Sequence, residues 1–498
     1  MAGMPGTEGS PGQLPRRAAE QRVLDWLARH QDSMVSDLRE LLTIESVKAP
    51  GREGEPFGPG VTRALRWVQT RAEQLGLSTA WVDGYAVHAH AGPPAGPTGS
   101  GGLVGVLCHV DVVPAGVGWS VPPFSGEVRD GRVFGRGALD DKGPTVASLY
   151  AVAALANAAV PLSRPVRLIV GGDEESGFAC LRYYFARHPR PEAAFSPDSL
   201  FPVVFAEKGI LSLTLRRSGV EGPLRWARAG EQPNVVPDRA ELELALPGDP
   251  PPEAWLERLR AAAARRRARI ELHPRHAGPG CGDGPAVHMV AVGKATHGSV
   301  PEKGINAAAE LLACVAEADG GTGRLDPAGC ATFLARAGLE VYGRGLGIAR
   351  QDDISGLLTC NLGVLRWEHG HIRAVFDIRY PVAERDAAGI VASAARTAGE
   401  AGFAVGDVQD DPPHSVDPDS PLVRTLLQVY REEAGDDLGP LAIGGGTYAR
   451  LLPNAVGYGP SFPLRTAVIP HEPDEHISLE HLFQLARIYA RALVALAA

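Results

Sequence analysis

A set of histidine and carboxylate side chains borders short apolar segments of this 498-residue chain. Imidazole and carboxylate groups are zinc ligands, and a carboxylate can also act as a general base. The candidates are His109, Asp111, Asp140, Asp141, Asp173, Glu174, Glu175, Asp198 and His471. A two-metal site needs a carboxylate that bridges ions about 3.5–4 Å apart and another that deprotonates the bridging water. This set is large enough for both tasks.

Each candidate taken alone also has a structural interpretation. A single histidine more often forms hydrogen bonds than binds a metal, although Asp111, two positions after His109, can orient its ring. One of the adjacent Asp140 and Asp141 can cap the helix that begins near Pro144 while the other is solvated. Adjacent buried carboxylates, however, repel each other unless cations neutralise them. The convergence of several such residues at strand ends therefore favours a metal site.

Alternating strands and helices are expected to bring these residues together. Apolar runs at 103–108, 166–170 and 203–206 predict strands, and the stretches at about 143–160 and 177–187 predict helices. This alternation indicates an α/β fold with a mostly parallel sheet and flanking helices. Ligands in such open sheets bind beyond the carboxyl ends of the strands, which is where the candidate side chains stand.

The pattern changes near residue 208, which predicts a second domain. Alternating strand-like segments with helices between them follow, as in an α+β fold, and a strand-like segment at 370–382 closes the region. The helices after it are expected to resume the first domain. The simplest partition is one domain of residues 1–207 and 383–498 that carries the candidate site, with residues 208–382 inserted into it.

Composition and charge exclude several classes of protein. Hydrophobic residues make up 44% and charged residues 21%, so a disordered or fibrous chain is excluded. A net charge of −9 argues against nucleic-acid binding, which normally shows as a basic face. No run of 18 apolar residues predicts a membrane span, and the N-terminal segment lacks the apolar stretch of a signal peptide. The six cysteines form no CxxC pair, and together these features indicate a cytoplasmic protein.

Eight motifs resemble, in sequence and in order, those of a known family. They are HVDVVPAGVGW (109–119), GRGALDDKGP (135–144), GDEESG (172–177), SPDSLFPVVFAEKG (196–209), GKATHGSVPEKGINAA (293–308), FDIRYPV (376–382), GGGTYAR (444–450) and HEPDEHI (471–477). The chain resembles the cytosolic dipeptidases of the PepV type. These belong to a group of di-zinc exopeptidases that also holds aminoacylases, carnosinases and desuccinylases. The resemblance runs from about residue 20 to residue 498. It implies a zinc-peptidase α/β domain with an inserted α+β lid domain.

The resemblance implies a metal-binding role for five residues. His109 and Asp198 would bind one zinc ion, and Glu175 and His471 would bind the other. Asp140 would bridge the two ions. The implied cofactor is thus a pair of zinc ions, for which manganese or cobalt can substitute.

The resemblance also implies roles around the metals. Glu174 would be the general base, and Asp111 would be the partner that orients His109. The peptide bond between Asp140 and Asp141 is expected to be cis.

Residues of the inserted domain are implied to bind the substrate. His297 would stabilise the oxyanion of the tetrahedral intermediate, and Arg379 would bind the C-terminal carboxylate of the substrate. Asn234 and the backbone of Gly446 and Thr447 would complete the pocket. The structural alternatives are a surface histidine at 297, an ion pair of Arg379 with a neighbouring acid, and a turn residue at 234.

The resulting hypothesis is a metallodipeptidase that hydrolyses dipeptides with a free C-terminal carboxylate, using a metal-bridged water activated by Glu174. An N-acyl amino acid amidohydrolase of the same group is the alternative, because it would use the same metals and a similar carboxylate clamp. An inactive binding module would be expected to lack Glu174 or a ligand, and all are present. The stretch FPVVFAEKG (201–209) and the inserted segment 208–382, which is long enough to cover the site without a second subunit, favour the dipeptidase. We therefore expect a monomer, although the sequence leaves a dimer and the preferred dipeptide open.

Overall fold

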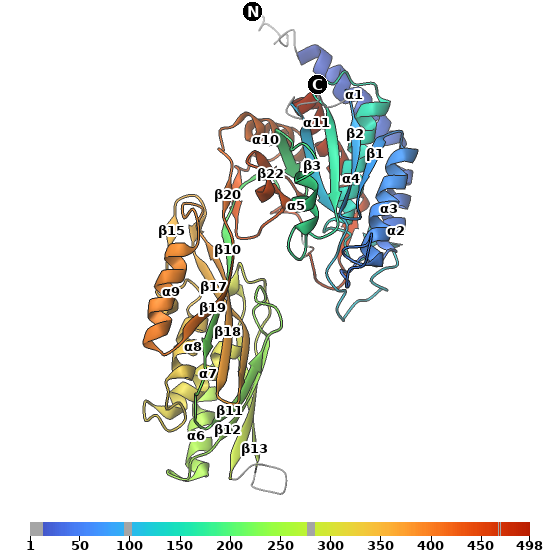
Figure 1. Ribbon diagram of the computed structural model, residues 1–498. Coiled ribbons are helices and arrows are strands. Elements are labelled where there is room, and N and C mark those ends of the chain that lie inside the picture. Colours follow the sequence, from blue (N-terminus) through green and yellow to red (C-terminus); the bar gives the residue numbers. More distant parts are fainter. Residues whose placement is uncertain (1–12, 94–101, 276–283, 467, 469) are drawn as a thin grey trace, which may run out of the picture. The chain divides into compact units, whose positions relative to one another are not determined.

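The structure is a computed structural model that describes residues 13–93, 102–275, 284–466, 468 and 470–498. The chain forms two compact units, and the second is inserted into the first (Figure 1). The first unit is built from the segment up to Phe205, Ser415–Leu441 and Thr447–Ala498, and the second from Ala206–His414 and Ala442–Gly446.

A nine-stranded sheet forms the centre of the first unit, in the order β1-β2-β6-β3-β7-β22-β9-β20 with β21 beside β9. Its strands are β1 (Ser78–Val82), β2 (Ala86–Ala91), β3 (Val104–His109), β6 (Val166–Gly171), β7 (Ala193–Ser196), β9 (Val204–Glu207), β20 (His414–Ser415), β21 (Leu441–Ile443) and β22 (Ala455–Gly457). The central strands β6, β3, β7 and β22 run parallel. In contrast, β2 is antiparallel to β6 and β9 is antiparallel to β22. The α/β fold is confirmed, with its parallel strands at the centre of the sheet.

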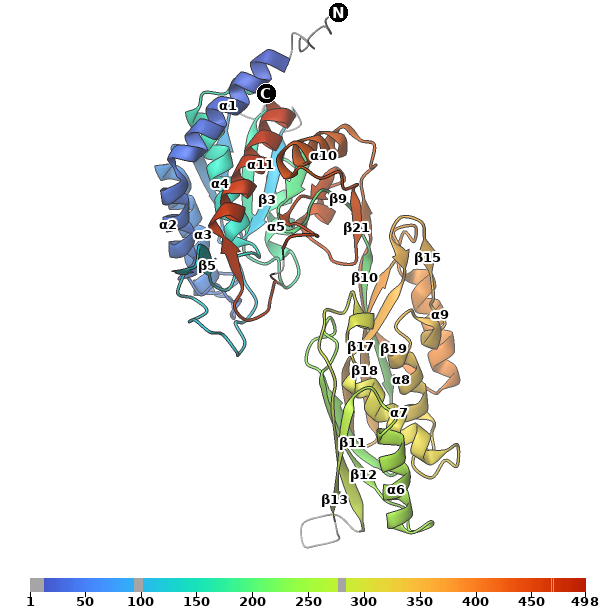
Figure 2. The same cartoon turned by 180° about the vertical axis from the view of Figure 1, so that it is seen from behind.

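Helices pack over this sheet because their apolar faces, and those of the strands, must be buried. They are α1 (Gln13–Arg29), α2 (Gln31–Leu42), α3 (Pro59–Gln74), α4 (Lys142–Asn157), α5 (Ala179–Phe185), α10 (Pro421–Ala434), α11 (Leu479–Ala497) and the short η3 (Tyr448–Leu451). α4 is rich in alanine, valine and leucine and buried almost throughout, as expected of a helix between a sheet and other helices. α1 and α11 lie beside it (Figure 2).

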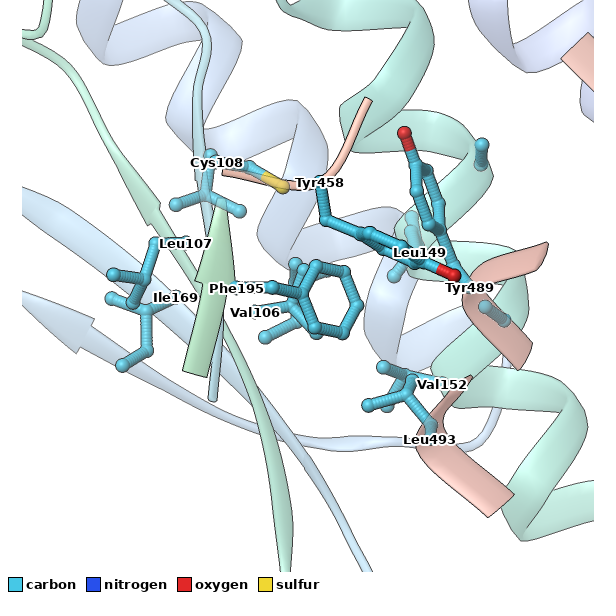
Figure 3. Packing of buried hydrophobic residues seen from close by; sticks show 14 of the residues in the cluster. Val106, Leu107, Cys108, Leu149, Val152, Ile169, Phe195, Tyr458, Tyr489 and Leu493 are labelled. Atoms are coloured by element: carbon cyan, nitrogen blue, oxygen red, sulfur yellow. The ribbon is translucent and has the colours of Figure 1, made fainter. Parts of the chain in front are cut away.

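Side chains of the central strand β3 alternate between the two faces of the sheet, as the two-residue period of a strand requires. Val106 of β3 and Phe195 of β7 face Leu149 of α4 and Leu493 of α11, whereas Leu107 points to the opposite side (Figure 3). All of these side chains are buried. The strand that ends at the candidate site is therefore held by apolar packing on both faces.

Two small sheets complete the first unit. β4 (Glu127–Arg129), β5 (Arg132–Phe134) and β24 (His476–Ser478) form one of them, in the order β24-β5-β4. β8 (Ser199–Leu200) and β23 (Pro460–Ser461) form the other. The pairing of β24 with β5 brings the segment that follows His471 beside the segment that precedes Asp140.

The second unit is an eight-stranded antiparallel sheet with helices along one face (Figure 2). In spatial order its strands are β13 (Arg269–Arg275), β14 (Ala286–Val292), β12 (Arg239–Ala245), β11 (Leu224–Ala229), β17 (Thr359–Glu368), β18 (His371–Tyr380), β10 (Gly209–Arg217) and β19 (Ala404–Asp411). Its helices are α6 (Pro252–Ala263), η1 (Pro301–Lys303), α7 (Ala307–Asp319), α8 (Cys330–Leu339), η2 (Arg344–Leu346) and α9 (Ala388–Glu400). A hairpin of β15 (Gln351–Asp352) and β16 (Gly356–Leu357) lies between η2 and β17.

The second unit extends further along the chain than the sequence predicts. The expected boundary at residue 382 is wrong, because the second unit continues to His414. α9 follows that boundary and packs on β19, which pairs with β10 along the edge of the second sheet. Helical periodicity identifies α9 but does not say which sheet the helix covers.

Five of the six cysteines are buried free thiols, and Cys281 lies outside the described residues. Among the helices that the structure describes, none is both long and apolar enough to cross a membrane.

Candidate metal centre

The candidate ligands of the first unit gather where its central strands end. His109 is the last residue of β3, Glu174 and Glu175 follow β6, and Asp198 follows β7. Because these strands run parallel, their carboxyl ends meet at one edge of the sheet. Two further ligand candidates, Asp140 and His471, reach this edge from the turn before α4 and from the loop before β24.

The carboxylate of Asp140 lies between two imidazole rings. Its Oδ1 is 3.0 Å from Nε2 of His109, and its Oδ2 is 3.0 Å from Nε2 of His471. Nε2 of His109 is also 3.6 Å from Oδ2 of Asp198, and Nε2 of His471 is 3.2 Å from Oε1 of Glu175. One carboxylate thus offers an oxygen to each of two neighbouring groups of ligand atoms.

Within the described part of the chain, two groups of side chains have the composition and spacing of a metal site. In each group the ligand atoms lie within 4.8 Å of one another. The first group is His109, Glu174 and Asp198, and the second is Asp140, Glu175 and His471. The structure therefore brings together every metal-site residue expected from the sequence and places Glu174 among them.

Asp111 connects His109 to the loop that carries the two glutamates. Nδ1 of His109 lies 3.0 Å from the backbone carbonyl of Asp111 and 3.5 Å from its Oδ1. The same carboxylate accepts the backbone N–H groups of Glu174 and Glu175, at 3.1 and 3.2 Å. Nδ1 of His109 faces these acceptors and therefore carries the proton, so Nε2 is the nitrogen that faces the other ligand atoms.

Asp141 belongs to neither group. Its Oδ2 accepts hydrogen bonds from the backbone N–H of His109, at 3.0 Å, and from the hydroxyl of Thr145, at 3.3 Å. It stands at the N-cap position of α4, but its side chain makes no capping hydrogen bond, and it is fully buried rather than solvated. The peptide bond that joins it to Asp140 is cis, as expected.

The crowding of buried carboxylates changes their pKa values. Burial raises the pKa of Asp198 to about 7, and the negative charge of Asp140 adds to the effect. Burial and the charge of Asp198 raise the pKa of Glu174 well above its usual range. Burial would raise the pKa of Asp140 as well, but the hydrogen bonds from His109 and His471 lower it well below its usual range. Such a cluster favours any cation that can compensate its charge.

The two histidines provide that positive charge in the absence of other cations. Desolvation would lower the pKa of His471, but the hydrogen bonds to Asp140 and Glu175 raise it to about 11. Burial likewise opposes protonation of His109, yet its carboxylate neighbours, Asp111 first, raise the pKa of its ring well above the usual range. A divalent ion would compensate the same carboxylates while leaving the imidazoles neutral, as metal binding requires. Because all the donors are carboxylates or imidazoles, they fit a zinc ion or a similar divalent metal.

His297 and Asn234 lie side by side in the second unit. Val235, which follows Asn234, forms an isolated β-bridge with His297, and the backbone N–H of Gly298 donates to the carbonyl of Asn234 at 2.6 Å. Nδ1 of His297 accepts the backbone N–H of Ser299 at 3.2 Å. A nitrogen that accepts a hydrogen bond is unprotonated, so the proton of the neutral ring is on Nε2. The histidine can therefore donate a hydrogen bond through Nε2.

Arg379 of β18 is buried, with 4% of its side chain exposed. Its Nε and Nη2 donate to the two oxygens of Asp377, at 2.7 and 3.0 Å, and its Nη1 donates to the carbonyl of Gly444 at 2.9 Å. The ion pair that was the structural alternative for Arg379 is thus present. Within the described part of the chain, these bonds leave one N–H on each terminal nitrogen for another acceptor.

The glycine-rich segment 444–447 passes from one unit to the other. Gly446 ends the part of this segment that belongs to the second unit, and Thr447 begins the part that belongs to the first. The buried Thr447 side chain caps η3 by accepting the N–H of Ala449 at 3.1 Å. This bond uses the threonine hydroxyl as an acceptor.

The sequence interpretation gave no role to Arg136 or Glu475. Arg136 lies four residues before Asp140 in the motif at 135–144, and Glu475 lies four residues after His471 in the motif at 471–477. Only the folded chain shows that they form a buried ion pair, with Nη1 of Arg136 2.6 Å from Oε2 of Glu475. Their position as charged residues within the motifs that contain the proposed metal ligands could have indicated a role near the site.

Comparisons with known proteins identify the family of the chain. The family model described as peptidase family M20/M25/M40 matches residues 105–495. A Bacillus subtilis (strain 168) protein named "Putative dipeptidase YtjP" is 35% identical over 482 residues, which cover 94% of this chain and 98% of that protein. Among solved structures, the di-peptidase Dug1p from Saccharomyces cerevisiae has a TM-score of 0.55 at 13% identity, covering 96% of this chain and 98% of that one. Human carnosine dipeptidase 1 has a TM-score of 0.52 at 16% identity and covers 96% and 99%. The two structures are similar to this chain in fold.

Proposed function

The chain belongs to the peptidase family M20/M25/M40, and from this membership we propose that it hydrolyses dipeptides with a free C-terminal carboxylate in a metal-dependent reaction. The observation that carries the proposal is the carboxylate of Asp140, which lies 3.0 Å from Nε2 of both His109 and His471. The dipeptidase name of a relative that matches 94% of this chain supports the substrate class.

Two zinc ions would be held by the two groups of ligands, with manganese or cobalt as possible substitutes. His109 and Asp198 would bind one ion, Glu175 and His471 the other, and Asp140 would bridge them. When bound, such ions polarise the scissile carbonyl and lower the pKa of a water molecule from 15.7 to about 7.

Glu174 is the proposed general base. Its backbone is fixed by the hydrogen bond to Asp111, and its carboxylate belongs to the ligand group of His109 and Asp198. The glutamate takes a proton from the attacking water as the oxygen bonds to the carbonyl carbon. It then gives this proton to the amine nitrogen as the C–N bond breaks, so that one water is consumed and two amino acids are released.

Residues of the second unit are proposed to bind the substrate. His297 would donate its Nε2–H to the oxyanion, a type of interaction whose removal typically costs about 3–4 kcal/mol of transition-state stabilisation. Arg379 would bind the terminal carboxylate through its remaining N–H groups, while Asp377 holds its other edge. Asn234 and the backbone of the 444–447 segment, including Gly446 and Thr447, would complete the pocket.

A substrate panel tests the proposal. The purified protein, supplied with zinc or manganese, is assayed against dipeptides, tripeptides, amidated dipeptides and N-acyl amino acids. Rapid release of amino acids from free dipeptides alone is the expected result. Cleavage of N-acyl amino acids without cleavage of dipeptides would contradict the proposal and identify an amidohydrolase of the same family.

A further inference from the structure

Arg136 and Glu475 are buried, oppositely charged residues that the proposed reaction does not use. Their side chains are 1% and 0% exposed, and Nη1 of Arg136 donates to Oε2 of Glu475 over 2.6 Å. They are 339 positions apart in the sequence. One belongs to the segment that leads to Asp140 and the other to the segment that follows His471, so the ion pair joins the two segments.

The second carboxylate oxygen of Glu475 holds the turn that carries Asp140. Its Oε1 accepts the backbone N–H groups of Leu139, at 2.8 Å, and of Asp140, at 3.1 Å. A carboxylate that accepts two adjacent N–H groups fixes the plane of the peptide between them. The direction in which the Asp140 side chain leaves the backbone therefore depends on Glu475.

The guanidinium of Arg136 holds the loop that carries His471. Its Nη2 donates to the carbonyl of His471 at 2.9 Å and to that of Ala115 at 3.2 Å, and its Nη1 donates to the carbonyl of Glu472 at 3.3 Å. His471 has a positive φ of 71°, which costs a residue other than glycine free energy. The hydrogen bonds from Arg136 help to hold this conformation.

The pair continues a short ladder between the same two segments. β24 pairs with β5, with His476 opposite Phe134, and the backbone N–H of Gly135 donates to the carbonyl of Glu475 at 3.0 Å. The ion pair therefore sits at the end of this ladder nearest to the ligands.

We propose that Arg136 and Glu475 are a positioning pair that sets the placement of Asp140 relative to His471 and thereby the affinity of the Asp140, Glu175 and His471 group for its ion. The proposal rests on the proposed function, because it takes both groups to bind metal ions. Among the hydrogen bonds of the described residues, none joins His109, Glu174 or Asp198 to either member of the pair. The affinity of that group for its ion should therefore change less.

The conservative change Glu475→Gln removes the charge but keeps the shape. A glutamine has one acceptor oxygen, so either Arg136 or the two N–H groups of the Asp140 turn lose their partner. Loss of a residue that orients metal ligands typically lowers metal affinity about 10–100-fold. We expect a loss of this size for the ion of the Asp140, Glu175 and His471 group, and a smaller loss for the other ion, to which the pair is connected only through Asp140.

The experiment is a titration of the metal-free full-length protein with Zn²⁺ in competition with a chromophoric chelator, which yields two dissociation constants. Arg136→Lys is the second variant, because it keeps the charge but loses the planar fork that reaches several carbonyls. His471→Ala identifies the ion bound by its group. Asp37→Asn is the matched control: Asp37 is buried in the same unit and accepts hydrogen bonds from Arg71 at 2.5 Å and Tyr150 at 2.6 Å.

We expect Glu475→Gln and Arg136→Lys to lower mainly the affinity for the same zinc ion whose binding His471→Ala weakens. The Asp37→Asn control should lower thermal stability without changing either zinc affinity. If Glu475→Gln does not fold, Arg136→Lys decides the question. Wild-type affinity for both ions in the folded variants, or equal weakening of both ions, would overturn the positioning role. An unmutated protein that binds no zinc would instead overturn the proposed function.

Discussion

Replacing Asp111 by asparagine should weaken zinc binding without unfolding the protein. The carboxylate of Asp111 accepts the N–H groups of Glu174 and Glu175 through its two oxygens, at 3.1 and 3.2 Å, and its Oδ1 lies 3.5 Å from Nδ1 of His109. The asparagine NH₂ group must face one of the two backbone N–H groups, because only one of its terminal atoms is an acceptor. One backbone donor then loses its partner.

The size of the effect follows from that lost bond. A buried donor left without a partner costs about 1–3 kcal/mol, and every 1.4 kcal/mol is tenfold in a dissociation constant. The affinity of the group that contains His109 and Glu174 should therefore fall roughly 5–150-fold, in line with the 10–100-fold typical of residues that orient metal ligands. Competition of the metal-free protein with a chelator for Zn²⁺ measures this directly.

Asp319→Asn is the control for this variant. Asp319 is a buried carboxylate of the second unit that also accepts two backbone N–H groups, those of Gly323 at 2.8 Å and Leu325 at 2.6 Å. Both variants should lower the melting temperature, but only Asp111→Asn should bind zinc more weakly. The reasoning is refuted if Asp111→Asn retains wild-type zinc affinity or if Asp319→Asn loses as much affinity.

Three further predictions concern the proposed base, the carboxylate clamp and acid stability. Glu174→Gln should lower kcat by roughly 10²–10⁴ at unchanged zinc content, and near-normal turnover would mean that another group activates the water. Amidated dipeptides should be poor substrates, and Arg379→Ala should slow only the free dipeptides; equal rates on both in the unmutated enzyme would contradict the clamp. Burial would raise the pKa of Asp319, but the N–H groups of the following loop lower it below its usual range. Urea unfolding should therefore show that the unmutated protein is more stable than Asp319→Asn by a full amount above the unfolded pKa of about 3.9, and by less as the pH falls below it. A difference in stability that does not change with pH would contradict this.

The place of the proposed metal ligands in the fold could be predicted because it follows from local features. His109, Glu174 and Asp198 each come after an apolar run that forms a buried strand, and parallel strands bring their carboxyl ends to one edge. Which residues have supporting roles could not be predicted in this way. Arg136 and Glu475 look like ordinary charged residues in glycine-rich or acidic segments, and their pairing depends on a ladder between strands that are hundreds of residues apart.

The boundary of the second unit shows the same limit. α9 has a clear helical pattern, and β19 reads as an exposed, partly acidic strand. Nothing in either segment tells which sheet it joins, because pairing with β10 is a long-range contact. Arg379 of the second unit is a further case. Asp377, two residues before it in the sequence, made an ion pair plausible, and in the structure both oxygens of Asp377 accept hydrogen bonds from Arg379.

The central claim is that the two ligand groups joined by Asp140 hold two metal ions that the reaction requires. The most direct test is to add Zn²⁺ stepwise to metal-free protein and to follow bound metal, by mass spectrometry under native conditions, together with dipeptide hydrolysis. We predict that hydrolysis is absent without metal and that it reaches its maximum as bound metal reaches two ions per chain. Hydrolysis by the metal-free protein, or a stable ratio near zero after zinc is supplied, would contradict the claim.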